Sequence, residues 1–398
     1  MKYLSPQFRV VLVAFTIICL SSCKTKGNEI KTTEKITVGA ERLDKYLPLV
    51  KGKKIGLVVN HTSTVGNSHL LDTLLSLGEN VKGIYAPEHG FRGEASAGAT
   101  IKDGKDGKTG IIVFSLYGKN KKPSPEMLAG IDVLIFDIQD VGARFYTYSS
   151  TLHYVMEAAG EQDIPLIVLD RPNPNGHYVA GPVLEKDFKS FVGLNPIPVV
   201  HGLTLGEMAQ MINGEGWTKQ HCDLTVIPCS NYDHKSKYEV PIKPSPNLPN
   251  NQSIYLYPSI CFFEPTVISV GRGTDMQFQV IGGPLKAYGD FSFTPVDKPG
   301  AKDPVNEGVK CFGMDLRNSS AFEDKFTLDY LIDFYSKSTN PKGFFTNENF
   351  FNLLMGNNWV IQDIKAGKTA EQIQSKWEKP LAEYKLSRKK YLIYPDFE

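Results

Sequence analysis

Short apolar runs alternate with amphipathic segments over the first half of the chain. The apolar runs are rich in β-branched residues, as strands buried on both faces are; they lie at residues 54–60, 81–85, 111–116, 133–138, 165–169 and 224–227. Segments with helical spacing separate them, at residues 69–77, 124–130, 148–162 and 204–213. Ser124 is expected to cap one of these helices, and Thr204 with Glu207 to form the capping box of another. This alternation predicts an α/β domain with a doubly wound, Rossmann-like parallel sheet.

The pattern changes after residue 233. Residues 241–258 are dense in Pro and Asn and predict an irregular crossing segment. Further strands are expected at residues 267–270, 277–281, 310–316 and 389–394, and helices at residues 328–335 and 369–384. We therefore expect a Rossmann-like domain at residues 38–230 and a smaller α+β domain at residues 231–398 that closes a cleft.

The first residues have the features of a secretory signal. Lys2 and Arg9 precede an apolar run at residues 10–20, which is too short to span a bilayer comfortably. The run ends in Leu-Ser-Ser-Cys, which resembles the bacterial lipobox and implies that Cys23 carries the lipid. An ordinary signal peptide with a chance cysteine is the alternative. We expect a lipoprotein signal peptide at residues 1–22, a tether at residues 23–37, and a location in the bacterial cell envelope, lipid-anchored to a membrane and facing the periplasm.

Composition and short motifs exclude several classes of function. The formal net charge is +1, and the chain has no basic run interleaved with aromatic residues, so a nucleic-acid partner is not expected. The first strand is followed by Asn60 rather than by a GxGxxG loop, and no paired CxxC motif is present, so neither a dinucleotide cofactor nor a metal is expected. Cys222 and Cys229 could form a disulfide, but the strand between them should hold them apart, so free buried cysteines are predicted.

Polar side chains follow four of the first five predicted strands. Open parallel sheets bind ligands beyond the carboxyl ends of their strands, so these residues predict a site, although loops are often polar for other reasons. The polar residues at these ends are Asn60, His61, Thr62, Ser63, Glu88, His89, Arg92, Asp137, Gln139, Asp140, Arg144, Asp170, Arg171, Asn173 and Asn175.

Glu88 is the leading catalytic candidate. It follows Pro87 at the end of a buried strand, and a carboxyl group at the rim of an apolar sheet loses hydration, which favours the protonated form that a general acid needs. The alternative is that Glu88 only pairs with Arg92 or Arg144. His89 could orient Glu88 or hydrogen-bond under the loop.

A second carboxylate could come from three places. Asp137 and Asp140 lie three residues apart at a strand end, so both need not face a cleft, and Glu264 would reach the site from the second domain. Each could equally form a structural ion pair. Arg144 and Tyr146 suit a carboxylate on a sugar, because a guanidinium offers a bidentate fork and a tyrosine ring an amphipathic stacking surface.

The remaining candidates for binding lie in turns. Asp170, Arg171 and Asn173 belong to a rigid polar turn whose side chains can donate to and accept from a ligand, although the same sequence is common turn chemistry. Arg272 lies between two glycines in the second domain.

Several long motifs resemble the exo-β-N-acetylmuramidase family, the NamZ-like family that was once a domain of unknown function. The motifs, ordered along nearly all the chain after the tether, are Asn-His-Thr-Ser at 60–63, Pro-Glu-His-Gly-Phe-Arg-Gly at 87–93, residues 136–148, Asp-Arg-Pro-Asn-Pro at 170–174 and Gly-Arg-Gly-Thr at 271–274.

The resemblance implies an exo-acting glycosidase that releases N-acetylmuramic acid from the non-reducing ends of peptidoglycan fragments or of disaccharides that contain this sugar, in cell-wall recycling. It implies a Rossmann-like domain, a smaller domain and a cleft between them, with Glu88 as the catalytic glutamate. Arg92, Arg144 and Arg272 are candidates for the lactyl carboxylate. The second catalytic role remains open among Asp137, Asp140, Glu264 and the 2-acetamido group of the substrate.

Two other functions use the same residues. A metal-dependent hydrolase could take ligands from His61, His89, Asp137 and Asp140, although no HExxH-like spacing supports it. A non-enzymatic lipoprotein that captures muropeptides could use the same cleft and the same arginines.

Overall fold

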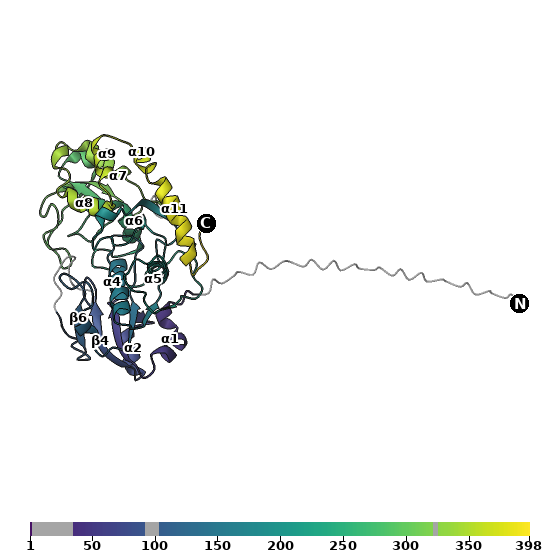
Figure 1. The fold of residues 1–398 in the computed structure, drawn as a ribbon. Coiled ribbons are helices and arrows are strands. Elements are labelled where there is room, and N and C mark those ends of the chain that lie inside the picture. Colours follow the sequence, from purple (N-terminus) through teal and green to yellow (C-terminus); the bar gives the residue numbers. More distant parts are fainter. Residues whose placement is uncertain (2–34, 92–102, 321–324) are drawn as a thin grey trace. The chain divides into compact units, whose positions relative to one another are not determined.

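A seven-stranded sheet forms one end of the body in the computed structural model, which describes residue 1 and residues 35–91, 103–320 and 325–398 (Figure 1). The strand order is β11-β8-β7-β1-β4-β6-β5. All neighbours are parallel except β5, which runs antiparallel to β6. The strands are β1 (Lys54–Val59), β4 (Asn80–Ala86), β5 (Gly104–Lys105), β6 (Ile112–Ser115), β7 (Val133–Asp137), β8 (Leu166–Leu169) and β11 (Leu224–Ile227). The predicted doubly wound parallel sheet is confirmed, and the predicted signal peptide and most of the tether lie outside the described residues.

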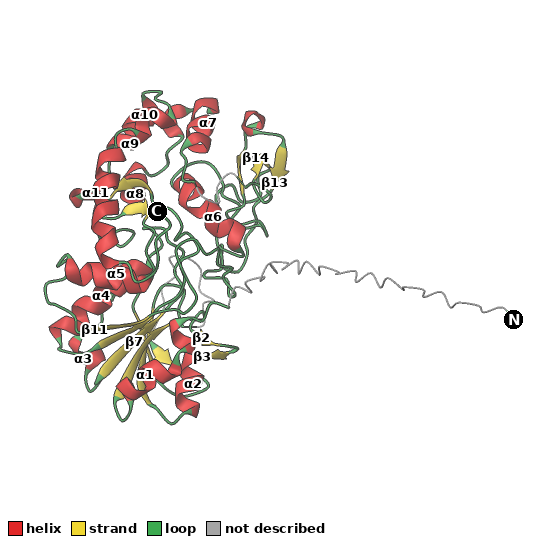
Figure 2. Ribbon diagram, turned by 90° about the vertical axis from the view of Figure 1, so that its right-hand side faces the viewer, coloured by secondary structure: helices red, strands yellow, loops and turns green. Residues whose placement is uncertain are grey.

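Helices cover both faces of this sheet (Figure 2). Side chains alternate along β1, so Leu57 and Val59 pack on one face and Val58 on the other. One face carries α1 (Leu43–Val50) and α2 (Leu70–Ser76); the other carries α4 (Tyr148–Glu161) and α5 (Leu205–Gly214). Burial on both faces explains why the strands are apolar throughout rather than alternating in polarity.

The predicted helix starts are confirmed. The Ser124 side chain accepts a hydrogen bond from Met127 N at the start of α3 (Pro125–Leu128). Thr204 and Glu207 form the predicted capping box of α5. These bonds satisfy backbone N–H groups that would otherwise lack partners in the first turn.

The second half of the chain is mixed. Helix α6 (Asn251–Ile260) is followed by an antiparallel sheet in the order β12-β14-β13, with strands Val280–Gly283, Cys311–Asp315 and Phe291–Phe293. The later helices are α7 (Asp329–Lys337), α8 (Glu348–Met355), α9 (Trp359–Lys365), α10 (Ala370–Gln374) and α11 (Glu378–Arg388). Short 3-10 helices lie at Gly39–Glu41, Lys186–Phe188, Cys261–Phe263, Lys286–Tyr288, Pro341–Gly343 and Lys389–Tyr391.

Several expectations for this half were wrong. The predicted irregular segment contains the start of α6, and Pro258 lies inside that helix. Proline has no N–H for the carbonyl four residues earlier, and here Asn175 Nδ2 donates to that carbonyl, Ile254 O, at 3.1 Å. Residues 267–270 form no named strand, the single helix predicted at 369–384 is two helices, and the predicted last strand is a 3-10 turn. Helices α8 and α9 were not expected.

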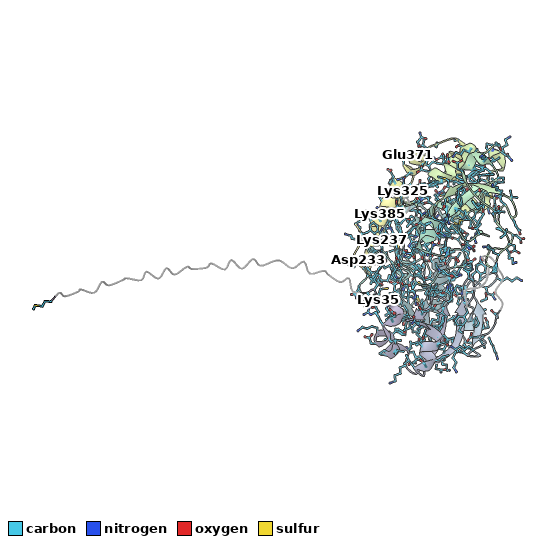
Figure 3. The ribbon with its side chains drawn as sticks, turned by 180° about the vertical axis from the view of Figure 1, so that it is seen from behind. Lys35, Asp233, Lys237, Lys325, Glu371 and Lys385 are labelled. Carbon is cyan, nitrogen blue, oxygen red and sulfur yellow. The ribbon has the colours of Figure 1, made fainter. Side chains whose placement is uncertain are left out.

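Two small sheets and the C-terminal segment complete the fold. The strand pairs are β2 (Thr64–Val65) with β3 (Ser68–His69), and β9 (Ala180–Val183) with β10 (Pro198–Val200). The C-terminal segment returns to the sheet region: Tyr394 Oη donates to Asp170 Oδ2 at 2.6 Å, and Ile393 N to Glu207 Oε1 at 3.0 Å. Figure 3 shows Lys35, Asp233 and Lys385 along this side of the molecule.

Residues 35–398 form one compact unit, so the expected boundary between residues 230 and 231 stays a prediction. The cysteines of this unit are free and buried, as predicted: Cys222, Cys229, Cys261 and Cys311. In the part of the chain that the structure describes, no helix has the length and apolar character needed to cross a membrane.

Candidate active site

A cavity of about 290 Å³ lies beyond the carboxyl ends of β4 and β6, where α4 begins. This volume is near the lower end of small-molecule sites, roughly 300–1,000 Å³. Its walls come from both halves of the chain. The polar residues that line it are Glu88, His89, Tyr117, Tyr146, Thr147, Tyr148, Ser245, Asn247, Tyr257, Glu264 and Arg272.

Glu88 is held on one wall by a hydroxyl group. Thr147 Oγ1 donates to Glu88 Oε2 at 2.8 Å, and the Tyr117 side chain lies beside the same carboxyl group. Thr147 is the N-cap residue of α4, so the carboxyl group lies near the positive end of a helix dipole. Burial, together with the charge of Glu88, raises the pKa of Tyr117, which keeps its hydroxyl neutral and able to donate.

The backbone beside Glu88 has an unusual conformation. His89 has φ 70° and Gly90 has φ 76°. The left-handed region disfavours side chains other than Gly, Asn, Asp and His, so His89 is tolerated there at some conformational cost. This turn directs the chain sharply out of β4 and places Glu88 at the cavity wall.

The other wall carries an ion pair between Glu264 and Arg272. Arg272 Nε donates to Glu264 Oε1 at 2.5 Å, and the Cys261 thiol donates to Glu264 Oε2 at 3.5 Å. The Arg272 guanidinium lies 5.1 Å from the centre of the Phe278 ring, and Phe278 itself has φ 53°, which is rare for an aromatic residue. The Arg272 and Glu264 side chains remain 25% and 20% exposed, so both face the cavity from a fixed position.

Tyrosines form the floor between the two walls. The rings of Tyr146 and Tyr148 meet edge to face at 4.9 Å, and Tyr146 Oη donates to Pro244 O at 2.8 Å. Asn60 lies behind them and donates from Nδ2 to Tyr148 Oη at 2.9 Å. Burial raises the pKa of both tyrosines, so they offer ring surface and neutral hydroxyls rather than charge.

Asp137 and Arg171 are buried outside the cavity. Arg171 Nε donates to Asp137 Oδ1 at 2.5 Å, and Arg171 Nη2 donates to Asp137 Oδ2 and to Thr64 O, both at 2.9 Å. The two side chains are 0% and 5% exposed. The structure therefore places this predicted pair in the interior, where it links β7 to the turn after β8.

Asp140 and Arg144 are also buried away from the cavity. Asp140 Oδ2 accepts from Gly142 N at 2.7 Å and lies 3.7 Å from His201 Nε2. Arg144 donates to three backbone carbonyls, those of Pro182, Ile197 and Leu354. Burial lowers the pKa of Arg144 to about 9. Arg144 thus joins three segments of the chain.

The remaining predicted residues support the loops around the site. Asp170 accepts four hydrogen bonds, from Arg171 N, Gly206 N and the hydroxyls of Thr204 and Tyr394, and burial raises its pKa to about 6. Asn173 Nδ2 donates to Leu203 O, and His61 Nε2 lies 2.8 Å from Lys243 O. Burial lowers the pKa of His61.

The structure thus brings together five of the predicted site residues at the cavity: Glu88, His89, Tyr146, Glu264 and Arg272. Eight others lie outside it: Asn60, His61, Asp137, Asp140, Arg144, Asp170, Arg171 and Asn173. Arg92 and Cys23 lie outside the described residues. Among residues 35–91, 103–320 and 325–398, no three His, Cys, Asp or Glu side chains gather as a metal-binding group.

Sequence reasoning missed six polar residues of the cavity: Tyr117, Thr147, Tyr148, Ser245, Asn247 and Tyr257. Tyr117 follows β6, so the rule that led to Glu88 would have found it if tyrosines had been counted among the polar residues at strand ends. Ser245 and Asn247 lie in the segment interpreted as irregular, where no pattern singled them out.

Comparisons with known proteins cover nearly the whole chain. The N-terminal family model of the exo-β-N-acetylmuramidase NamZ matches residues 55–252, and the C-terminal model matches residues 255–394. A curated relative is the peptidoglycan β-N-acetylmuramidase NamZ of Bacillus subtilis (strain 168), 38% identical across 95% of this chain and 96% of the relative.

Two solved structures are similar in fold and sequence, both of DUF1343 family proteins from Bacteroides fragilis NCTC 9343. The first has a TM-score of 0.84 and 47% identity, and covers 91% of this chain and 99% of its own. The second has a TM-score of 0.79 and 29% identity, and covers 90% of this chain and 99% of its own.

Proposed function

Because the chain belongs to the NamZ family of exo-β-N-acetylmuramidases, we propose that it is a glycosidase that releases N-acetylmuramic acid from the non-reducing ends of peptidoglycan fragments. The observation that carries this proposal is a single cavity with one carboxyl group on each of two walls, Glu88 and Glu264, and a guanidinium beside the second. Its biological setting is the turnover and recycling of cell wall.

Glu88 acts as the general acid. Glycoside hydrolysis needs a proton donor to the leaving oxygen and stabilisation of an oxocarbenium-like centre. A bound sugar covers Glu88 and excludes water from its carboxyl group. The Thr147 hydroxyl fixes the direction in which the carboxyl group faces the leaving oxygen, and Tyr117 lies beside it.

Glu264 is the best-supported protein group for the second role. Asp137 and Asp140 were equal candidates on sequence grounds, but their carboxylates are buried and do not line the cavity. Glu264 lines it and is oriented by Arg272. It stabilises the positive charge that develops at the anomeric carbon.

Arg272 supports a preference for muramic acid, whose lactyl group carries a carboxylate. Its contacts with Glu264 use Nε and Nη2, and in the described part of the chain we find no hydrogen bond from Nη1. A guanidinium with a free donor at a cavity wall suits a second carboxylate. Sugars without the lactyl group lack this contact.

The direct test is incubation of the purified protein with a chromogenic β-N-acetylmuraminide, with and without a metal chelator. We expect release of the chromophore that the chelator does not affect. Binding without release would contradict the proposal and favour capture of muropeptides, and loss of activity with the chelator would favour a metal-dependent hydrolase.

We also propose that the protein is a lipoprotein, anchored through Cys23 in the cell envelope and facing the periplasm. The apolar run at residues 10–20 and the Leu-Ser-Ser-Cys sequence after it support this proposal. Metabolic labelling with radioactive palmitate should mark the wild-type protein and not the C23S variant, and only the wild type should remain in the membrane fraction. Equal labelling of both would contradict it.

A further inference from the structure

A tight turn at residues 245–248 forms part of the cavity wall and has no role in the mechanism above. Leu248 N donates to Ser245 O at 3.2 Å, which closes the turn. Ser245, Asn247 and Leu248 all line the cavity, although these residues are only 5%, 3% and 1% exposed. Polar side chains that are buried to this degree normally have hydrogen-bond partners. A donor or acceptor atom among them without a protein partner is therefore available to a ligand.

The orientation of the Asn247 amide is fixed. Its Nδ2 lies 2.9 Å from Gly300 O. A carbonyl oxygen can only accept, so the nitrogen must face Gly300 and Oδ1 must point the other way. In the described part of the chain we find no donor to Oδ1, which leaves an acceptor available at the cavity wall.

Ser245 supplies the complementary donor. Its Oγ accepts a hydrogen bond from Asn247 N at 3.3 Å, so its own proton remains available for another group. Apolar surface lies beside these two groups, because Leu248, Tyr257 and Phe278 line the same cavity. The turn therefore presents one acceptor, one donor and an apolar patch, all held by backbone contacts.

We propose that this turn is the recognition site for the 2-acetamido group of the sugar. The acetamide N–H donates to Asn247 Oδ1, the acetamide carbonyl accepts from Ser245 Oγ, and the methyl group packs on Leu248. The proposal rests on the proposed function, and it names the residues that recognise the N-acetyl group. A sugar with a free 2-amino group leaves the acceptor, the donor and the apolar patch without partners, which sites of this kind discriminate against strongly.

Calorimetry with the two free sugars tests this proposal without relying on turnover. The dissociation constants of N-acetylmuramic acid and of muramic acid are measured for the wild type, S245A and N247L. We expect the wild type to bind the acetylated sugar at least about 100-fold more tightly, and each substitution to reduce this ratio by roughly 10-fold, mainly by weakening binding of the acetylated sugar. The N213L variant is the control, because Asn213 Nδ2 also donates to a backbone carbonyl, that of Cys222, but Asn213 does not line the cavity.

Each outcome decides the question. A ratio below about 10 in the wild type, or equal weakening of both sugars in S245A and N247L, would overturn the proposal, as would an absence of binding to either sugar. S245A keeps the turn closed, because it leaves the bond between Leu248 N and Ser245 O in place, so it remains informative if N247L fails to fold. A wild type that shows the expected ratio but releases no chromophore from the muraminide would contradict the proposed function and leave the recognition site standing.

Discussion

Two arginine–carboxylate pairs in this protein have the same contact distance and different surroundings. Arg171 Nε lies 2.5 Å from Asp137 Oδ1, and Arg272 Nε lies 2.5 Å from Glu264 Oε1. The first pair is almost fully buried, while a fifth to a quarter of each side chain in the second remains exposed at the cavity. The comparison shows that residue type and pairing do not distinguish a buried structural pair from one that lines a cavity, whereas the exposure of the side chains does.

The strand order explains why the Asp137–Arg171 pair is buried and does not line the cavity. The order of the sheet reverses between β1 and β7, and open α/β sheets commonly bind ligands at such a switch point. Here Asn60 follows β1, Asp137 is the last residue of β7, and both are fully buried. Side chains therefore fill the switch point. The cavity lies instead at the ends of β4 and β6, over the start of α4.

The largest expected effect is on catalysis at the exposed wall. E88Q should reduce kcat by roughly 10³–10⁴-fold, because the amide cannot supply the proton that a general acid delivers. Activity on the chromogenic muraminide is measured, together with thermal unfolding. E157Q, on α4 but outside the cavity, is the control and should retain activity. Undiminished turnover in E88Q would remove Glu88 from the acid role.

The buried pair should respond in stability instead. R171M leaves Asp137 without its charged partner in the interior and should lower the free energy of unfolding by about 3–5 kcal/mol. Urea denaturation measures this change. R317M provides a comparison, because the Arg317–Asp315 pair is exposed and its loss should cost no more than about 1 kcal/mol. Similar losses of unfolding free energy in R171M and R317M would show that burial does not determine how much each pair contributes to stability.

The cavity pair should respond mainly in substrate binding. R272M should raise KM by roughly 10- to 100-fold, since it removes a charged hydrogen-bond donor from the wall that faces the substrate. The free energy of unfolding should change less than in R171M, because Glu264 remains partly hydrated. A large loss of stability with unchanged KM would reverse the assignment of the two pairs.

A smaller effect is expected at the Tyr117 hydroxyl beside Glu88. Y117F should lower kcat by about 10-fold with little change in KM, because the polar hydroxyl beside the Glu88 carboxyl group is lost while the ring remains. Y154F is the matched control: the ring of Tyr154 stacks on Phe191, which Tyr117 also contacts. Equal kinetic losses in both variants would indicate disturbed ring packing rather than loss of the hydroxyl.

The smallest effect concerns the turn after β4. Glycine adopts positive φ without strain, so H89G should be more stable than H89A by about 1 kcal/mol, since both lack the imidazole and only H89A keeps a Cβ at φ 70°. Urea denaturation of the two variants gives the difference. Equal stabilities would show that the turn stores no conformational strain.

The regular part of the fold was predictable from the sequence because its signals are local. The ends of β1 and β7 coincide with the change from apolar to polar residues, and the caps of α3 and α5 are formed by residues within three positions of each other. Helix α6 was not predictable in this way. Its proline is accommodated by the hydrogen bond from Asn175 to Ile254 O. These residues lie 79 positions apart in sequence, so no local pattern predicts the bond.

The sequence could not show which candidate residues line the cavity and which are buried outside it, because the contacts that decide this are also long-range. Glu88 and Glu264 were both proposed, and both line the cavity. Asp137 had equal standing, because its pairing with Arg171, 34 residues away, follows from strand order rather than from spacing. Ser245 and Asn247 are common turn residues, and only the fold shows which of their polar atoms lack partners.

The C-terminal segment has a consequence for how the protein folds. Asp170 and Glu207, at the sheet end of the body, accept hydrogen bonds from the Tyr394 hydroxyl and the Ile393 amide. These donors lie 224 and 186 residues from their acceptors along the chain. The polar interior beside β8 is therefore completed only when these two distant segments meet, so the folding of this region depends on long-range contacts.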